Sequence, residues 1–125
     1  MSVGNITDTG TSTICGCINT TLDNIYTYLP SIQIGVITPS PWTGKNPYSG
    51  VTKEKADEFV EKLIQICKMR SIPCLDVYHN SNLRPWIEAD RTAYYHNGDG
   101  THPNSDGHMK FAPMIAEFIK SLITK

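Results

Sequence analysis

The sequence predicts an α/β fold with three layers, in which helices cover both faces of a parallel sheet. Two amphipathic helical patterns alternate with two short apolar runs over residues 14–78, in the order helix, strand, helix, strand. Strands separated by a helix are joined by right-handed crossovers, which makes them parallel. A third helical pattern closes the chain after residue 104. These observations favour a three-layer α/β/α arrangement.

Length and composition are those of one globular domain. The 125 residues are 39% hydrophobic and 18% charged, which allows one core and leaves no room for a second. The formal net charge of −1 gives no basic surface, so nucleic acid is not an expected partner. No apolar run is long enough to span a membrane, and the N-terminus lacks the regions of a signal peptide. The localisation stays open, with a soluble cytoplasmic protein as the default.

The first helix and the first strand are predicted from capping and apolar periodicity. Ser12 or Thr13 can cap a helix that Pro30 ends. Its apolar stripe consists of Ile14, Ile18, Leu22, Ile25 and Leu29. Residues 32–37 are a nearly continuous apolar run, which is typical of a strand buried on both faces.

A long loop with two large aromatic residues follows this strand, over residues 40–50. In a parallel α/β sheet, loops that leave the C-terminal ends of strands line the ligand crevice. Trp42 and Tyr48 are therefore candidate substrate-binding residues. The alternative is that the two rings only anchor the loop to the body of the protein.

The second half of the chain repeats the pattern of helix and strand. Thr52 caps a helix with one apolar and one charged face, and residues 72–78 are predicted to form the next strand. The loop after this strand contributes Trp86 as a third candidate substrate-binding residue. Residues 88–95 are mixed in character and form either a short helix or an irregular segment. Asn104, Ser105 or Asp106 then caps the last helix.

Asp99 and His102 are the strongest candidate catalytic residues. They lie in a loop bounded by glycine and proline, Asp99-Gly100-Thr101-His102-Pro103-Asn104. A carboxylate on one ring nitrogen of a histidine fixes its tautomer and leaves the other nitrogen to act as a general base. The alternative is a turn in which the Asp99 side chain only binds nearby amides. What this pair lacks is a nucleophile.

The block from Asp99 to Asn104, followed by Gly107-His108 and an amphipathic helix, resembles the last conserved block of the SGNH hydrolases, also called GDSL-type lipases and esterases. The resemblance implies an SGNH or flavodoxin-like fold and hydrolysis of a small ester by a Ser-His-Asp triad without a cofactor. Asp99 would be the acid of this triad and His102 the base. The resemblance covers the whole chain, but only the C-terminal part of the family domain.

The other conserved blocks of that family do not occur in this sequence. No Gly-Asp-Ser block is present, and residues 4–8 only approach the Gly-x-Asn-Asp block, with different spacing. We therefore expect a domain truncated at its N-terminus, without the serine and the oxyanion donors. Ser40 follows a strand, but the prolines on both sides do not suit a nucleophile elbow. Cys15 lies in the first turn of a helix that is expected to pack, which does not suit a nucleophile either.

The histidines and cysteines give no local metal-binding motif. His79 and His96 could join His102 and Asp99 in a zinc site, but no closely spaced pair of histidines supports one, so no metal is expected. The four cysteines are Cys15, Cys17, Cys67 and Cys74. They either form two disulfides or a metal site, or are reduced and mostly buried thiols, and the second interpretation is favoured.

Two functions of different classes remain. The first is an SGNH-type ester hydrolase, of the lipase and acylhydrolase class or of the carbohydrate esterase class, of which this chain carries the acid and the base but no recognisable serine. The second is a non-catalytic α/β module, or a degenerate hydrolase fragment that acts in interaction or assembly. In both cases a buried parallel strand with few partners leaves an exposed sheet edge, so we expect self-association through this edge.

Overall fold

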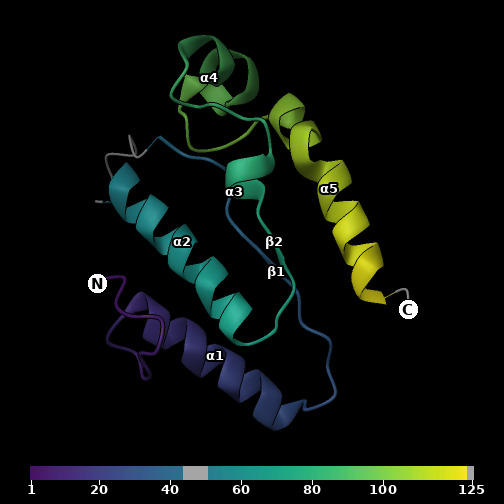
Figure 1. Ribbon diagram of the computed structural model, residues 1–125. Helices are drawn as coiled ribbons and strands as arrows, with labels where there is room; N and C mark the ends of the chain where they lie inside the picture. The colour runs from purple at the N-terminus through teal and green to yellow at the C-terminus, as the bar shows by residue number, and fades with distance from the viewer. Residues whose placement is uncertain (44–50, 124–125) are drawn as a thin grey trace.

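The computed structural model describes residues 1–43 and 51–123, and most of these residues are helical (Figure 1). The elements in chain order are α1 (Ile14–Tyr28), β1 (Val36–Ile37), α2 (Lys53–Met69), β2 (Cys74–Leu75), α3 (Val77–Asn80), α4 (Glu88–Tyr94), the 3-10 helix η1 (His96–Gly98) and α5 (Ser105–Ile123). None of these helices combines the length and the apolar character that crossing a membrane would require.

The predicted three-layer α/β/α fold with a parallel sheet is wrong. Helices account for 56% of the described residues and strands for 5%, and the sheet consists of two strands. β1 and β2 are parallel, but they pair only through Val36 with Cys74 and Ile37 with Leu75. Each strand has one neighbour in this sheet, and a strand keeps its ladder only where a neighbour runs beside it. The apolar run of residues 32–37 therefore contributes two residues to the sheet.

The predicted strand over residues 72–78 is also too long, because only Cys74 and Leu75 are in the sheet and the last two residues of the range are helical. Asp76 ends the strand and caps α3: its Oδ1 accepts a hydrogen bond of 3.0 Å from the backbone N–H of His79. An aspartate at this position satisfies an amide that the first turn of a helix leaves unpaired. The chain therefore turns into α3 directly after β2.

The two longest predicted helices of the first half begin where their capping residues predict. The Thr13 hydroxyl accepts from the N–H of Gly16 at 3.0 Å, and the Thr52 hydroxyl accepts from the N–H of Lys55 at 3.2 Å. Residues 88–94 form a helix rather than an irregular segment. The positions of these helices thus followed from local chemistry, whereas α3 and the pairing of the strands did not.

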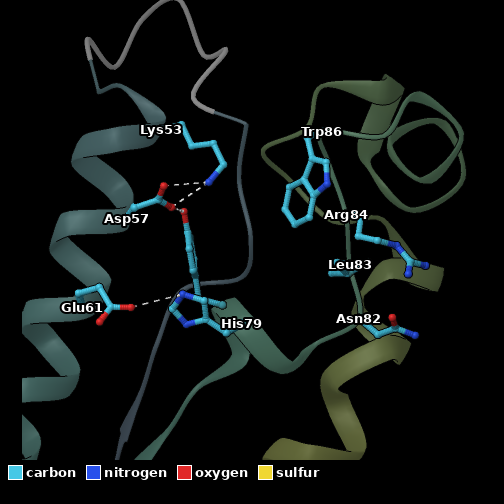
Figure 2. A pocket seen from close by; sticks show the side chains of 9 residues that line it. Lys53, Asp57, Glu61, His79, Asn82, Leu83, Arg84 and Trp86 are labelled. Carbon is cyan, nitrogen blue, oxygen red and sulfur yellow. Dashed lines mark hydrogen bonds and ion pairs between the residues drawn. The ribbon is translucent and has the colours of Figure 1, made fainter.

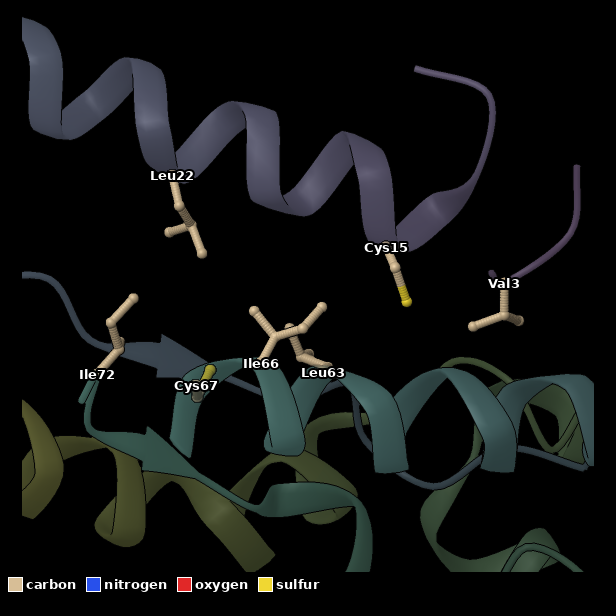
Figure 3. Close-up of a cluster of buried hydrophobic side chains, with 7 residues drawn as sticks. All are labelled: Val3, Cys15, Leu22, Leu63, Ile66, Cys67 and Ile72. Carbon is tan, nitrogen blue, oxygen red and sulfur yellow. The ribbon is translucent and has the colours of Figure 1, made fainter. Parts of the chain in front are cut away.

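The larger apolar core lies between α1 and α2, which run side by side on one side of the two strands (Figure 1). Its buried members are Val3, Cys15, Leu22, Leu63, Ile66, Cys67 and Ile72 (Figure 3). None of the four cysteines is in a disulfide. Burial, together with the neighbouring Cys74, raises the pKa of Cys67 to about 12, so this thiol packs as a neutral group.

A second core lies on the side of the strands that α5 covers (Figure 1). Its buried residues are Val77, Leu83, Tyr95 and Phe111. Close contact between α5 and the chain before β1 depends on Gly35, since a Cβ at this position would lie 2.4 Å from Cδ1 of Leu122. The segment that carries the candidate acid and base joins α4 to α5 above this core.

Candidate functional site

The side chains of Asp99 and His102 are in direct contact. Oδ2 of Asp99 lies 2.6 Å from Nδ1 of His102, and Oδ1 accepts from the backbone N–H groups of Thr101 at 2.8 Å and His102 at 2.9 Å. The carboxylate is thus held on both oxygens, and it fixes the plane of the imidazole. Because Nδ1 faces the carboxylate, Nε2 points away from it. The His102 side chain is 71% exposed, so Nε2 is accessible from outside.

Asp99 carries its negative charge over a wide range of pH. Burial alone would raise the pKa of this carboxyl group, but the hydrogen bonds from the backbone of His102 and Thr101 and from the His102 ring outweigh it. The net result is a pKa below the ordinary value of the group. An ionised acid beside the ring is what stabilises an imidazolium when the histidine takes up a proton.

Gly100 allows this loop to pass close to Thr43 in the loop that follows β1. Gly100 has a φ of +67°, and a Cβ there would lie 2.7 Å from the hydroxyl oxygen of Thr43. A side chain at this position would be strained and would push away the loop that follows β1. The N–H of Thr43 donates to the Gly100 carbonyl at 3.0 Å, and the N–H of His96 donates to the His102 carbonyl at 2.8 Å.

Tyr95, Asn104 and Gly107 fix this loop to the rest of the structure. The buried Tyr95 hydroxyl donates to the carbonyl of Pro41 at 2.7 Å. Asn104 caps α5 by accepting from the N–H of Gly107 at 2.9 Å. A Cβ at Gly107 would lie 2.2 Å from the carbonyl oxygen of Tyr94, so the glycine lets α5 start directly against α4. Gly107 of the motif therefore has a packing role, whereas His108 is exposed.

Trp42, in the loop that follows β1, lies beside the loop of the candidate pair. Its indole N–H donates to the hydroxyl of Thr101 at 3.0 Å, directly next to His102 in the chain. Trp42, Ser40 and Thr101 line a groove of about 700 Å³, whose other walls are mostly apolar side chains of α2 and its surroundings. Among the described residues, no hydrogen bond joins Ser40 to His102. Tyr48 lies outside the described residues.

Trp86 occupies a different hollow. It lines a pocket of about 580 Å³ with Lys53 and Asp57 of α2 and His79 of α3 (Figure 2). Tyr78 lines both the pocket and the groove, so the two are neighbours. The structure therefore brings Trp42 to the Asp99–His102 pair and places Trp86 in the adjoining pocket.

A second pair of acid and histidine, which was not predicted from the sequence, lies at the end of β2. Oδ2 of Asp76 lies 2.8 Å from Nδ1 of His79, and Glu61 Oε1 lies 3.7 Å from Nε2 of the same ring. Asp76 and His79 have the same spacing in the sequence as Asp99 and His102, and they directly follow β2. This repeated spacing was the available signal, but the prediction of a strand through residue 78 concealed it.

The titratable side chains of the described ranges do not gather into a metal site. Within residues 1–43 and 51–123, no group of three or more histidine, cysteine, aspartate or glutamate side chains is arranged to hold an ion. His79, His96 and His102 are therefore not brought together as ligands.

Comparison with known proteins shows a shared fold but no function. No protein-family model matches the chain, and no curated protein matches it. One crystal structure superposes with a TM-score of 0.78 at 22% identity, over 97% of this chain and 57% of the other. A structural-genomics crystal structure of a protein from Lactobacillus plantarum gives a TM-score of 0.76 at 20% identity, over 96% of this chain and 59% of that one. The chain thus spans less than two thirds of the length of these structures.

The substitution Asp99→Asn tests the carboxylate and its pH dependence. The pKa of Asp99 is lower in the folded protein than its ordinary value of 3.8, so the ionised carboxylate stabilises the fold at pH values above 3.8. This stabilisation is lost as the pH falls through the lowered pKa. We therefore expect the variant to be less stable than the natural chain at neutral pH, with a difference that shrinks below pH 3.8. Urea denaturation over a series of pH values measures it. The exposed Glu117→Gln is the control, and a difference independent of pH would contradict the interpretation.

The substitution Tyr95→Phe tests the anchor of the loop. It removes the only side-chain donor that the described structure gives to the buried Pro41 carbonyl, and an unsatisfied buried acceptor costs about 1–3 kcal/mol. We expect a loss of that size in the free energy of unfolding, measured by urea denaturation. Tyr28→Phe on the exposed end of α1 should change it by less than about 0.5 kcal/mol. Equal effects of the two substitutions would disprove the anchoring role.

Proposed function

We propose that this chain is part of an SGNH-type ester hydrolase and supplies its acid, Asp99, and its base, His102. The contact of 2.6 Å between the Asp99 carboxylate and Nδ1 of His102, on a loop that borders a groove, supports this proposal. In this arrangement one ring nitrogen is held while the other is exposed, which is what a general base in acyl transfer needs.

The reaction would follow the acyl-transfer route of a serine hydrolase. Nε2 of His102 takes the proton from a serine hydroxyl as it attacks the ester carbonyl, and later donates this proton to the leaving alcohol. Asp99 stabilises the imidazolium between these two steps. A second attack, by water, then releases the acid by the same sequence of proton transfers.

The nucleophile and the oxyanion donors are assigned to a segment outside the given sequence. No serine hydroxyl is hydrogen-bonded to His102 in residues 1–43 or 51–123, and no Gly-Asp-Ser block occurs in the sequence. The longer solved structures that share this fold leave room for such a segment. The groove beside Trp42, with its apolar lining, suits the apolar part of a small ester.

A non-catalytic role is the second candidate, since the described residues give His102 no nucleophile. In that case the Asp99–His102 pair only stabilises the turn between η1 and α5, through the amides that Asp99 binds. The two candidate functions predict different results for a substitution of His102: ester turnover is lost if the chain is part of a hydrolase and is unchanged if its role is non-catalytic.

Hydrolysis of p-nitrophenyl acetate tests the catalytic proposal. The chain by itself should be a poor esterase, because acyl transfer needs both a nucleophile and oxyanion donors. A form extended along its gene to include a Gly-Asp-Ser block should be active. In this form His102→Ala and Asp99→Asn should lower kcat on the order of 10³-fold or more, and His108→Ala should leave it unchanged.

Two results would contradict the catalytic proposal. An extended form in which His102→Ala retains full turnover would favour the non-catalytic role. Strong turnover by the chain alone that is lost in Ser40→Ala would instead make Ser40 the nucleophile. Circular dichroism of each variant separates a lost function from a lost fold.

We further infer that copies of this chain associate through the exposed edge of the short sheet. β1 has one strand neighbour in the described structure, and the Ile37 side chain beside this edge is 40% exposed. Unpaired backbone groups next to an exposed apolar side chain favour pairing with another chain.

Sedimentation velocity at micromolar concentration measures this association. We expect dimers or larger species, and we expect Ile37→Lys to shift them toward monomer, because a charged side chain at a sheet edge opposes pairing. Glu117→Lys, which places a new cation on the exposed part of α5, is the matched control and should leave the distribution of species unchanged. A monodisperse monomer of the natural chain would overturn the inference.

A further inference from the structure

The pocket that contains Trp86 has the composition of a binding site, and the proposed hydrolysis does not use it. It lies between the N-terminal half of α2 and the chain that follows α3, with a volume of about 580 Å³ (Figure 2). This volume falls in the range of small-molecule sites. Lys53, Asp57 and Glu61 line it from α2, and His79 and Trp86 line it from the other side.

One wall of the pocket is a flat aromatic surface. Figure 2 shows Trp86 projecting from its loop toward Lys53 and Asp57 of α2. Trp86 is 55% exposed, and Nζ of Lys53 lies 5.8 Å from the centre of its ring system. Indole surface facing an open hollow is available to stack on a ligand with an apolar face.

The polar groups around this wall are already held in position. The Lys53 ammonium donates to both Asp57 oxygens, at 2.9 and 3.0 Å, and the Tyr78 hydroxyl donates to Asp57 as well. Burial alone would raise the pKa of Asp57, but the hydrogen bonds from Tyr78 and Lys53 outweigh it and lower this pKa. The carboxylate is therefore a fixed, charged acceptor at neutral pH, which reduces the cost of ordering it around a ligand.

His79 is oriented by the same kind of contact as His102. Its Nδ1 faces the Asp76 carboxylate at 2.8 Å, which in the neutral ring leaves Nε2 as the acceptor nitrogen. Figure 2 shows Glu61 reaching from α2 toward this ring, with Oε1 at 3.7 Å from Nε2. The lower part of the pocket thus presents two acceptors side by side.

The charged groups at the pocket do not favour an anion. Two cations, Lys53 and Arg84, and two carboxylates, Asp57 and Glu61, line it. Just outside the lining, Asp90 is paired with Arg84 at 2.9 Å and Asp76 with His79 at 2.8 Å, so carboxylates outnumber the permanent cations. This excess of negative charge disfavours an anionic ligand. A neutral molecule that has hydroxyl donors at its edge and an apolar face fits the acceptors and the indole.

We propose that this pocket binds a neutral pyranose ring of a carbohydrate. The C–H face of the sugar stacks on Trp86, and its hydroxyl groups donate to Asp57, Glu61 and Nε2 of His79. Because Tyr78 lines both hollows, the bound sugar lies next to the groove that contains Trp42 and Thr101. Sugar binding requires neither a nucleophile nor His102, so this proposal can be tested independently of the proposed ester hydrolysis.

The two tryptophans of the sequence allow a direct test by fluorescence. Trp42→Phe leaves Trp86 as the single indole, and its emission is recorded during titration with cellotriose, xylotriose and chitotriose. We expect at least one of these neutral trisaccharides to shift the emission to shorter wavelength in a saturable way, with a Kd of about 1 mM or tighter.

Matched variants assign the signal to the pocket. Trp86→Phe retains Trp42 as the reporter, and its emission should not respond; calorimetry should show binding weakened at least about tenfold. Glu61→Gln keeps the aromatic wall and should weaken binding several-fold, whereas Glu117→Gln on α5 should have no effect. Circular dichroism verifies that each variant is folded.

Three results would overturn the proposal. The first is that none of the three sugars changes the emission of Trp86 at about 20 mM, some twenty times the expected Kd. The second is that the Trp86→Phe chain binds the sugar as tightly as the natural chain. The third is that only glucuronic acid, an anionic sugar, binds, because the carboxylates at the pocket would then not disfavour an anion.

Discussion

The hydrogen bond from the Tyr95 hydroxyl to the Pro41 carbonyl joins the two loops on which the candidate site depends. Tyr95 is 1% exposed, and burial, followed by the nearby Asp90 and Asp99, raises the pKa of its phenol, so the group remains a donor. The backbone of Tyr95 also forms a bridge with Pro103, directly after His102. One residue thus connects the loop after β1, the second core and the loop of the acid–histidine pair.

The parts of the fold that the sequence predicts are those decided within a few residues. Thr13 and Thr52 cap their helices through amides three residues ahead, and Ile14, Ile18 and Leu22 of the predicted stripe of α1 meet the apolar face of α2 in one core. Strand pairing is decided between segments far apart in the chain. The apolar run at residues 32–37 was recognised, but how much of it forms a ladder depends on neighbours that its own composition does not reveal.

In the candidate site, too, contacts between residues close in the sequence were predictable, whereas contacts between distant residues were not. Asp99 and His102 are three residues apart, so their contact followed from turn chemistry alone. The bond from Trp42 to Thr101 joins residues 59 positions apart, and only the general rule on loops after strands anticipated it. The same rule did not separate Trp86 from Trp42, because the sequence predicts a strand before each of them, whereas in the structure α3 precedes Trp86. Which hollow a ring lines is set by the packing of α2 between them.

The two acid–histidine pairs have the same local geometry but different surroundings, and the surroundings determine the chemistry. In each pair the carboxylate holds Nδ1, at 2.6 Å for His102 and 2.8 Å for His79. Nε2 of His102 faces outward from a highly exposed side chain, whereas Nε2 of His79 already has a Glu61 oxygen 3.7 Å away. A general base needs an open side from which a hydroxyl can approach. His102 therefore suits proton transfer, while His79, with a carboxylate on both sides and an indole across the pocket, suits the recognition of hydroxyl groups.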